Sequence, residues 1–325
     1  MRQIPLDAIN DAARHVYQAA VRTPLIKLDL PFESPGVAAP EIYLKLESLQ
    51  PIGSFKIRGA WNAVRKLSPE QVRDGVWTVS AGNAAQGVAF AARLAGVPCS
   101  VMVMESAPQT KLRAIEQLGA TIVKVSYDEA WQTVESHASP RMKGHFVHPF
   151  DDDDFISGNG TAGLEIVEDL PDVEAVIAPV GGGGLLAGIG VALRALRPDA
   201  RVYAAEPETA APLRRSFDRN AASRFDEWSA SFVDGAGGKS VLDTMWPLLR
   251  EYVHDSIVVS LDDAARAMRL VAERARVIAE GAAACAVAAA VSPAFAARGH
   301  RKVVAVVSGG NVDLAKFARL VGACD

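Results

Sequence analysis

Residues 175–198 read AVIAPVGGGGLLAGIGVALRALRP. The first six residues are an apolar, β-branched run typical of a buried strand, and the residues from Leu185 onward have apolar spacing close to the helical period. Four consecutive glycines, Gly181, Gly182, Gly183 and Gly184, join the two segments. Each glycine costs backbone entropy on folding, so four in a row indicate backbone N–H groups that converge on an anion at a helix N-terminus. A tight strand–helix turn is the alternative.

The same alternation of strand and helix extends along the chain. Alanine-rich helical segments, such as AAQGVAFAARLAG at 84–96, each end at a glycine or proline. This order predicts an α/β protein with parallel sheets and helices on both faces. The predicted strands are 76–80, 99–104, 121–125, 175–180, 202–206 and 302–308.

The length of the strand–helix cycles predicts two domains. Three short cycles fall between about 72 and 147, and longer ones flank them. We therefore expect a small domain at 72–147 inserted into a large domain formed by 1–71 and 148–325. The charge run DDDD at 151–154 is predicted to be a solvated turn.

Composition excludes several classes of protein. Half of the 325 residues are apolar, 22% are charged and the net charge is −4, which is ordinary for a globular protein. No basic stripe is present, so no nucleic-acid partner is expected. The widely spaced Cys99, Cys285 and Cys324 match no metal-binding spacing. With no signal peptide and no apolar segment of about 20 residues, we expect a cytoplasmic protein without a membrane partner.

The stretch GSFKIRGA at 53–60 places Lys56 where a loop turns into a helix, beside Phe55. This lysine could be a solvated charge, a phosphate ligand or a nucleophile. The glycine loop already provides for a phosphate, so the nucleophile is favoured. It must be neutral to react, and desolvation would lower its pKa.

Two further loops follow predicted strands. In SAGNAAQG at 80–87, Ser80 or Asn83 caps the next helix, or the loop presents N–H groups to a carboxylate. In SGGN at 308–311, Ser308 either lies in a turn or points into the crevice where open α/β sheets bind ligands. A phosphate cradle, a carboxylate site, a hydroxyl and an amine together suggest a lysine bound as a Schiff base to pyridoxal phosphate (PLP).

A nicotinamide dinucleotide is the rival ligand. Gly182, Gly184 and Ala187 fit the pattern G-x-G-x-x-G/A, and Glu206 ends the next strand, where a ribose-binding acid would lie. This alternative leaves Lys56 and the SAGN loop unexplained.

The motifs occur in an order that resembles the threonine/serine dehydratase and serine racemase family of fold-type II PLP enzymes. The resemblance covers roughly residues 20–315. It implies a tryptophan synthase β-like fold with two open twisted parallel sheets, and a homodimer. The motifs are KLESLQPIGSFKIRGA (45–60), SAGNAAQG (80–87), GLEI (163–166), PVGGGGLLAGI (179–189), AEP (205–207), AEGAAA (279–284) and SGGNVDL (308–314).

The resemblance also implies the roles of individual residues. Lys56 would hold PLP and act as base and acid at the substrate Cα, Phe55 would pack on the ring, and Ser308 would face the ring nitrogen. Asn83 would bind the phenolic oxygen, and Glu280 lies near the ring. The phosphate would be held by Gly181, Gly182, Gly183, Gly184 and Leu185, and the substrate by Ser80, Ala81, Gly82, Asn83 and Ala84.

At two positions the chain differs from the family pattern in a way that affects the expected reaction. Racemases of the family carry a serine where this chain has Ala81, so β-elimination of a 3-hydroxy amino acid to a 2-oxo acid and ammonia is favoured over racemisation. The family commonly has histidine where this chain has Ala84, which predicts room for a bulkier substrate such as phenylserine. A non-catalytic PLP carrier is a further alternative, against which the complete set of motifs argues.

Two family features are expected to be missing. The divalent-metal site of some members would use Glu206 and Ala210, but Pro212 stands at its third position, so the metal site is incomplete. The chain ends shortly after the last motif, so a C-terminal regulatory domain is not expected.

Overall fold

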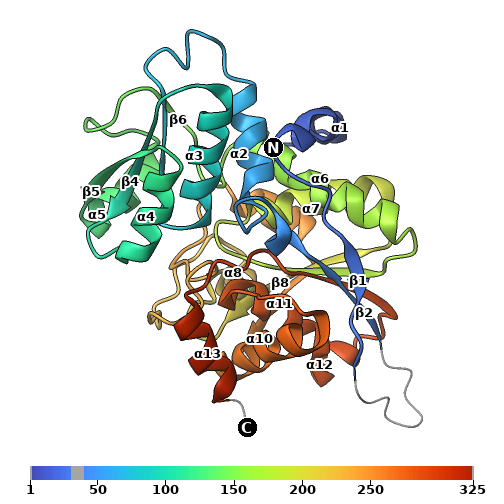
Figure 1. Ribbon diagram of the computed structural model, residues 1–325. Helices are drawn as coiled ribbons and strands as arrows, with labels where there is room; N and C mark the ends of the chain where they lie inside the picture. The colour runs from blue at the N-terminus through green and yellow to red at the C-terminus, as the bar shows by residue number, and fades with distance from the viewer. Residues whose placement is uncertain (1, 31–39, 324–325) are drawn as a thin grey trace.

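The computed structural model describes residues 2–30 and 40–323, which contain two sheets in separate parts of the molecule (Figure 1). The large sheet has the strand order β1-β2-β10-β7-β8-β9 and the small sheet the order β5-β4-β3-β6. Every described strand pair is parallel apart from β1 with β2. The strands are β1 (Leu25–Lys27), β2 (Glu41–Lys45), β3 (Val76–Val79), β4 (Cys99–Met104), β5 (Thr121–Val125), β6 (His145–Phe146), β7 (Ala175–Pro179), β8 (Arg201–Pro207), β9 (Asp255–Val259) and β10 (Lys302–Val306).

All six predicted strands are present: 99–104 and 121–125 have the predicted ends, and the ends of the other four differ by at most two residues. Within the described ranges the structure adds β1, β2, β6 and β9. β1 and β6 are only three and two residues long, and β2 includes Glu41 and Lys45, so none forms a long apolar run. The predicted α/β class with open parallel sheets is confirmed.

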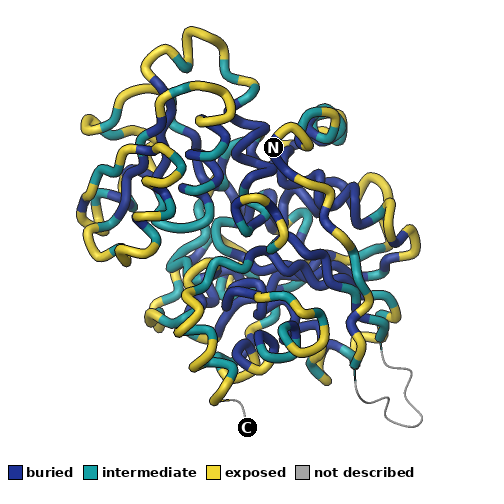
Figure 2. The backbone as a smooth tube through the Cα atoms, viewed as in Figure 1, coloured by how far each residue is buried: buried dark blue, intermediate teal, exposed yellow. Residues whose placement is uncertain are grey.

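Helices cover both faces of the large sheet and form a separate core on each (Figures 1 and 2). One core includes α10 and α11, and the other includes α6, α7 and α9. No helix of the described residues has the length and apolar character needed to cross a bilayer. The helices are α1 (Leu6–His15), α2 (Lys56–Arg65), α3 (Asn83–Ala95), α4 (Gln109–Gln117), α5 (Tyr127–Ser136), α6 (Asp153–Asp169), α7 (Gly184–Leu196), α8 (Pro212–Arg219), α9 (Trp246–Tyr252), α10 (Leu261–Ala275), α11 (Gly281–Val291), α12 (Pro293–Ala296) and α13 (Leu314–Gly322).

The small sheet is formed by strands that lie within residues 76–146, inside the predicted range of the small domain. Its core also contains residues of α2, among them Ile57, Ala60 and Val64. Helix α2 therefore packs against the small sheet's layer as well as against α6. The domain borders at 71/72 and 147/148 stay a prediction.

Glycines set the separation of α2, α6 and α7. A Cβ added to Gly158 of α6 would lie 2.4 Å from the carbonyl oxygen of Arg58 in α2. A Cβ added to Gly188 of α7 would lie 2.5 Å from the carbonyl oxygen of Ile156 in α6. No side chain fits at these distances, so glycine allows the three helices to approach closely. As a result, α6 fixes the distance between the first residue of α2, Lys56, and the start of α7.

A buried ion-pair network joins β2, α2 and α6. Arg58 donates from Nε to Oε2 of Glu47 (2.7 Å) and from Nη1 to Oε1 of Glu165 (2.6 Å), and Nζ of Lys45 lies 2.6 Å from Oε2 of Glu165. Each of the four side chains is at most 2% exposed. Burial alone would raise the pKa of Glu165, but Arg58 and Lys45 hold it below the usual value. The two cations and two anions neutralise one another, which burial requires.

The run at 151–154 is not the solvated turn that the sequence predicted. Asp151 is 6% exposed, and its carboxylate accepts hydrogen bonds from Arg2 and from Oγ1 of Thr244. Asp152 caps α6 by accepting from the N–H of Phe155 (2.8 Å). Of the four aspartates only Asp153 is exposed. The run therefore begins a helix, where acidic side chains are favoured by the helix dipole.

Cys99 and Cys285 are buried free thiols, and Cys324 lies outside the described residues.

Replacing Arg58 by methionine should destabilise the fold by about 3–5 kcal/mol, because it leaves two buried carboxylates without their main partner. Urea unfolding followed by circular dichroism measures this. The matched control is Arg73→Met at an exposed position, which should change stability by no more than about 0.5 kcal/mol. Equal effects of the two substitutions would contradict a structural role for the network.

Candidate active site

The site residues suggested by the sequence all line one cavity of about 400 Å³. It is bordered by the loops that follow β3, β7 and β10, and by the start of α2. Loops at the carboxyl ends of parallel strands meet in this way at the edge of an open sheet. The residues are Phe55, Lys56, Ser80, Ala81, Gly82, Asn83, Ala84, Gly181, Gly182, Gly183, Gly184, Leu185, Glu280 and Ser308.

Lys56 is the first residue of α2, and its amine is held without a charged partner. Nζ donates to the carbonyl oxygen of Pro149 (2.6 Å) and lies 5.2 Å from the ring centre of Phe55 and 5.3 Å from that of Phe155. None of the described carboxylates forms an ion pair with it. Burial lowers the pKa of Lys56 to about 8. A larger fraction of this amine is therefore neutral near pH 7 than for an exposed lysine, as a nucleophile requires.

Two backbone hydrogen bonds connect the lysine loop to the loop after β10. The N–H of Phe55 donates to the carbonyl oxygen of Ser308 (3.0 Å), and the N–H of Gly310 donates to that of Gly53 (2.9 Å). Ser308 is 2% exposed and lines the same cavity as Lys56. Segments about 250 residues apart in the sequence are thereby held in register.

The glycine loop ends at the N-terminus of α7, which begins at Gly184 after a left-handed Gly183 (φ 94°). The first N–H groups of a helix have no acceptor within it, so they are available to an anion. Packing also requires the glycines: a Cβ on Gly182 would lie 2.0 Å from the ring of Phe150, and one on Gly184 would lie 2.7 Å from its carbonyl oxygen. The loop thus combines a tight turn with a cradle that fits a phosphate group.

A chain of side-chain hydrogen bonds crosses the cavity floor. Nδ2 of Asn83 donates to Oε1 of Glu280 (2.8 Å), and Nδ2 of Asn311 donates to Oδ1 of Asn83 (2.8 Å) and to the carbonyl oxygen of Ile52 (2.8 Å). Burial, together with the charge of Asp234, raises the pKa of Glu280 to about 7. Asn83 keeps one N–H free for a ligand because its amide group has two.

Several residues of this cavity were not predicted from the sequence. Asn311 orients Asn83, and Pro149 and Phe150 contact the lysine and the glycine loop. Lys111 of α4 and Asp234 form an ion pair across the cavity wall. Only Asn311 lay in a loop that the sequence singled out, as the fourth residue of SGGN. The others carry no local pattern, because their positions depend on the packing of distant segments.

Glu206 is neither a ribose ligand nor a free metal ligand in this arrangement. Its carboxylate accepts hydrogen bonds from the N–H groups of Leu213 (2.8 Å) and Arg214 (2.7 Å) and from Oγ of Ser256 (2.5 Å). The side chain is fully buried, and burial raises its pKa to about 7. It therefore fixes the start of α8, and the expected partner position Ala210 is itself buried.

A second group of possible metal ligands, His137, His148 and Asp151, has ligand atoms within 4.8 Å of one another. Nδ1 of His148 already accepts the N–H of Asp151 (2.7 Å), and Nε2 contacts the carbonyl oxygen of Val134 (3.2 Å). Asp151 forms an ion pair with Arg2. The possible ligand atoms of His148 and Asp151 therefore already have partners within the protein.

Comparison with known proteins shows the enzyme family to which the chain belongs. The family model described as "Pyridoxal-phosphate dependent enzyme" matches residues 16–309. The chain therefore belongs to the PLP-dependent enzymes of fold-type II, and PLP is its cofactor. The helix N-terminus at Gly184, the hydrogen-bonding Asn83 and the lowered pKa of Lys56 all fit this group.

Within the family, the chain is similar to enzymes that act on hydroxy amino acids. It is 39% identical to an L-threonine ammonia-lyase of Thermotoga maritima over 98% of this chain and 78% of that protein. It is 34% identical to a serine racemase of Dictyostelium discoideum over 99% of both chains. The structure of maize serine racemase superposes with a TM-score of 0.88 at 31% identity, covering 98% of this chain and 97% of that one.

The lowered pKa of Lys56 can be measured directly. In the cofactor-free protein with ¹³C-methylated lysines, one resonance should titrate near pH 8 because burial disfavours the ammonium form. The Lys56→Ala variant identifies this resonance by its loss. The variant Lys143→Ala, at an exposed position, is the control and should keep this resonance. A Lys56 midpoint above pH 10 would show that the amine is solvated.

Proposed function

We propose that the protein is a PLP-dependent ammonia-lyase that converts a 3-hydroxy amino acid to a 2-oxo acid and ammonia. The observation that carries this proposal is the position of Lys56, which shares one cavity with the glycine loop and the Ser80–Ala84 loop. The similarity to a threonine ammonia-lyase and to serine racemases supports it.

The cofactor would be held by residues of both sheets' loops. Lys56 would bind it covalently, Phe55 would pack against its ring and Asn83 would donate to its phenolic oxygen. Ser308 would face the ring nitrogen, and Glu280 would hold Asn83 in place. PLP supplies an electron-accepting ring that stabilises negative charge developing at the substrate Cα. The N–H groups of Gly181, Gly182, Gly183, Gly184 and Leu185 would bind the phosphate.

The substrate would be oriented by the N-terminus of α3. The free N–H groups and the dipole at this end of the helix favour a carboxylate. The residues that would contact it precede the helix or form its start: Ser80, Ala81, Gly82, Asn83 and Ala84.

With the carboxylate held there, the amine of Lys56 would remove the Cα proton. A neutral hydroxyl such as that of Ser308 does not retain a proton on a pyridine nitrogen, which favours prompt loss of the 3-hydroxyl group. The Ala81 methyl group cannot transfer a proton, and this favours elimination over racemisation.

Replacing Lys56 by alanine should abolish both the near-visible absorbance of the purified holoenzyme and the release of ammonia from threonine, because the covalent attachment and the Cα base are lost together. Absorption spectra and a coupled ammonia assay measure the two effects. Lys143→Ala, at an exposed position, should retain both. An unchanged spectrum of the Lys56→Ala variant would refute the assignment.

We also propose that the substrate carries a side chain bulkier than that of threonine. Ala84 lines the cavity beside the proposed carboxylate site, and its methyl group leaves room that an imidazole would occupy. The room at Ala84 would admit an aromatic 3-hydroxy amino acid such as phenylserine to the cavity.

Ala84→His should lower the ratio of kcat/KM for phenylserine to that for threonine by about ten-fold, equivalent to about 1.4 kcal/mol of transition-state energy. Arg93→His, on the exposed face of the same helix, should leave the ratio unchanged. If the wild-type enzyme itself prefers threonine by ten-fold or more, the proposed bulkier substrate is wrong.

A further inference from the structure

A second cavity of about 490 Å³ adjoins the candidate active site. Val79, Ser80 and Ala81 line both cavities, and so do Trp131 and Val134 of α5. The loop that is proposed to bind the substrate carboxylate therefore borders both spaces, as do Gly181 and Gly182 of the glycine loop. We call this second cavity the side chamber.

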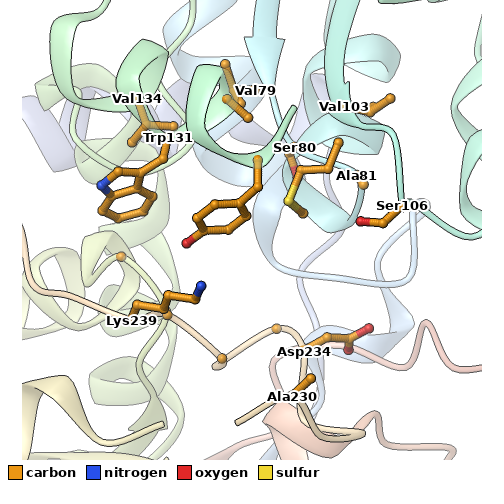
Figure 3. Close-up of a pocket in the computed structure, with 18 of the residues that line it drawn as sticks. Val79, Ser80, Ala81, Val103, Ser106, Trp131, Val134, Ala230, Asp234 and Lys239 are labelled. Carbon is orange, nitrogen blue, oxygen red and sulfur yellow. The ribbon is translucent and has the colours of Figure 1, made fainter. Parts of the chain in front are cut away.

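The side chamber is apolar on one side. Met102 and Val103 of β4, with Ala130, Trp131 and Val134 of α5, supply most of this wall. The opposite wall comes from residues 228–239, a segment without helix or strand. Figure 3 shows Trp131 and Val134 on one side of the space and Lys239 on the other.

Lys239 is held at the side chamber by aromatic rings. Its Nζ lies 4.1 Å from the ring centre of Tyr127 and 4.3 Å from that of Trp228. Within residues 2–30 and 40–323, no carboxylate forms an ion pair with this ammonium. Cation–π attraction therefore holds the charge, and a further aromatic ring entering the chamber would add to it.

Of the residues proposed to hold PLP, Gly181 and Gly182 also line this chamber, but the methyl group of threonine would leave most of it unfilled. An aryl group fits its chemistry better, because burying a ring against Trp131, Val134 and Met102 removes a large apolar area from water.

We propose that the side chamber receives an aryl group carried on Cβ of the substrate, with Trp131 and Lys239 as specificity-determining residues. The ring lies between the apolar wall of α5 and the ammonium of Lys239, while the amino acid portion stays in the catalytic cavity. This inference rests on the proposed β-elimination and names its substrate class.

The first experiment compares Trp131→Leu and Lys239→Met with the wild-type holoenzyme, using phenylserine and threonine as substrates. The ratio of kcat/KM for phenylserine to threonine should fall by about ten-fold for Trp131→Leu and by about three-fold or more for Lys239→Met. Lys143→Met is the matched control at an exposed lysine and should keep the wild-type ratio. An unchanged ratio in both chamber variants would overturn the inference.

The second experiment measures binding without turnover. Phenylalanine and alanine lack the 3-hydroxyl group, so neither can lose water. Calorimetric titration of the holoenzyme should give a lower Kd for phenylalanine than for alanine, and Lys239→Met should reduce that difference. Equal affinities in the wild-type holoenzyme would overturn the inference even if threonine is converted. If neither 3-hydroxy amino acid yields a 2-oxo acid, the proposed elimination fails instead, whatever the binding ratio.

Discussion

The buried cluster of Lys45, Glu47, Arg58 and Glu165 is the constraint on which the site depends. Charges taken out of water must be paired closely, so the cluster tolerates one arrangement of β2, α2 and α6. Arg58 lies two residues after Lys56 on the same helix. Fixing the guanidinium therefore fixes the start of α2, and with it the lysine amine beside Phe55. Because the cluster is neutral as a whole, it leaves the nearby amine free to lose its own charge on burial.

Helix α6 extends this constraint to the rest of the cavity. Its glycines allow α2 and α7 to pack against it at backbone distance, so the separation of Lys56 from the glycine loop follows from helix packing. The hydrogen bonds of Phe55 and Gly53 to the loop after β10 then close the remaining side. Packing and hydrogen bonds thus position the groups that would hold the cofactor without help from a ligand, which would spare part of the entropy cost of ordering them on binding.

The sequence predicted the α/β class and the grouping of the three strand-end loops, because both follow from local periodicity and from the position of strand ends in a parallel sheet. It did not predict the partners of those loops. Phe150 leaves no room for a side chain at Gly182 or Gly184, and Asn311 orients Asn83 by a hydrogen bond. In both cases the partners are far apart in the sequence. Local charge was misleading for Asp151, which pairs with Arg2 across about 150 residues. The partners of Glu206, by contrast, are mostly close in the sequence. Two of its three hydrogen bonds come from the N–H groups of Leu213 and Arg214, at the start of α8.

The position of β10 has a consequence for biosynthesis. This strand, residues 302–306, pairs on one side with β2 and on the other with β7, so it is the central link of the large sheet. A ribosome completes β2 long before β10, at about 5–20 residues per second. Until then β2 and β7 present unpaired edges, which other chains can join. Closure of the sheet thus waits for residues 302–306, and chaperone protection during translation would matter more for this chain than for one whose sheet forms in sequence order.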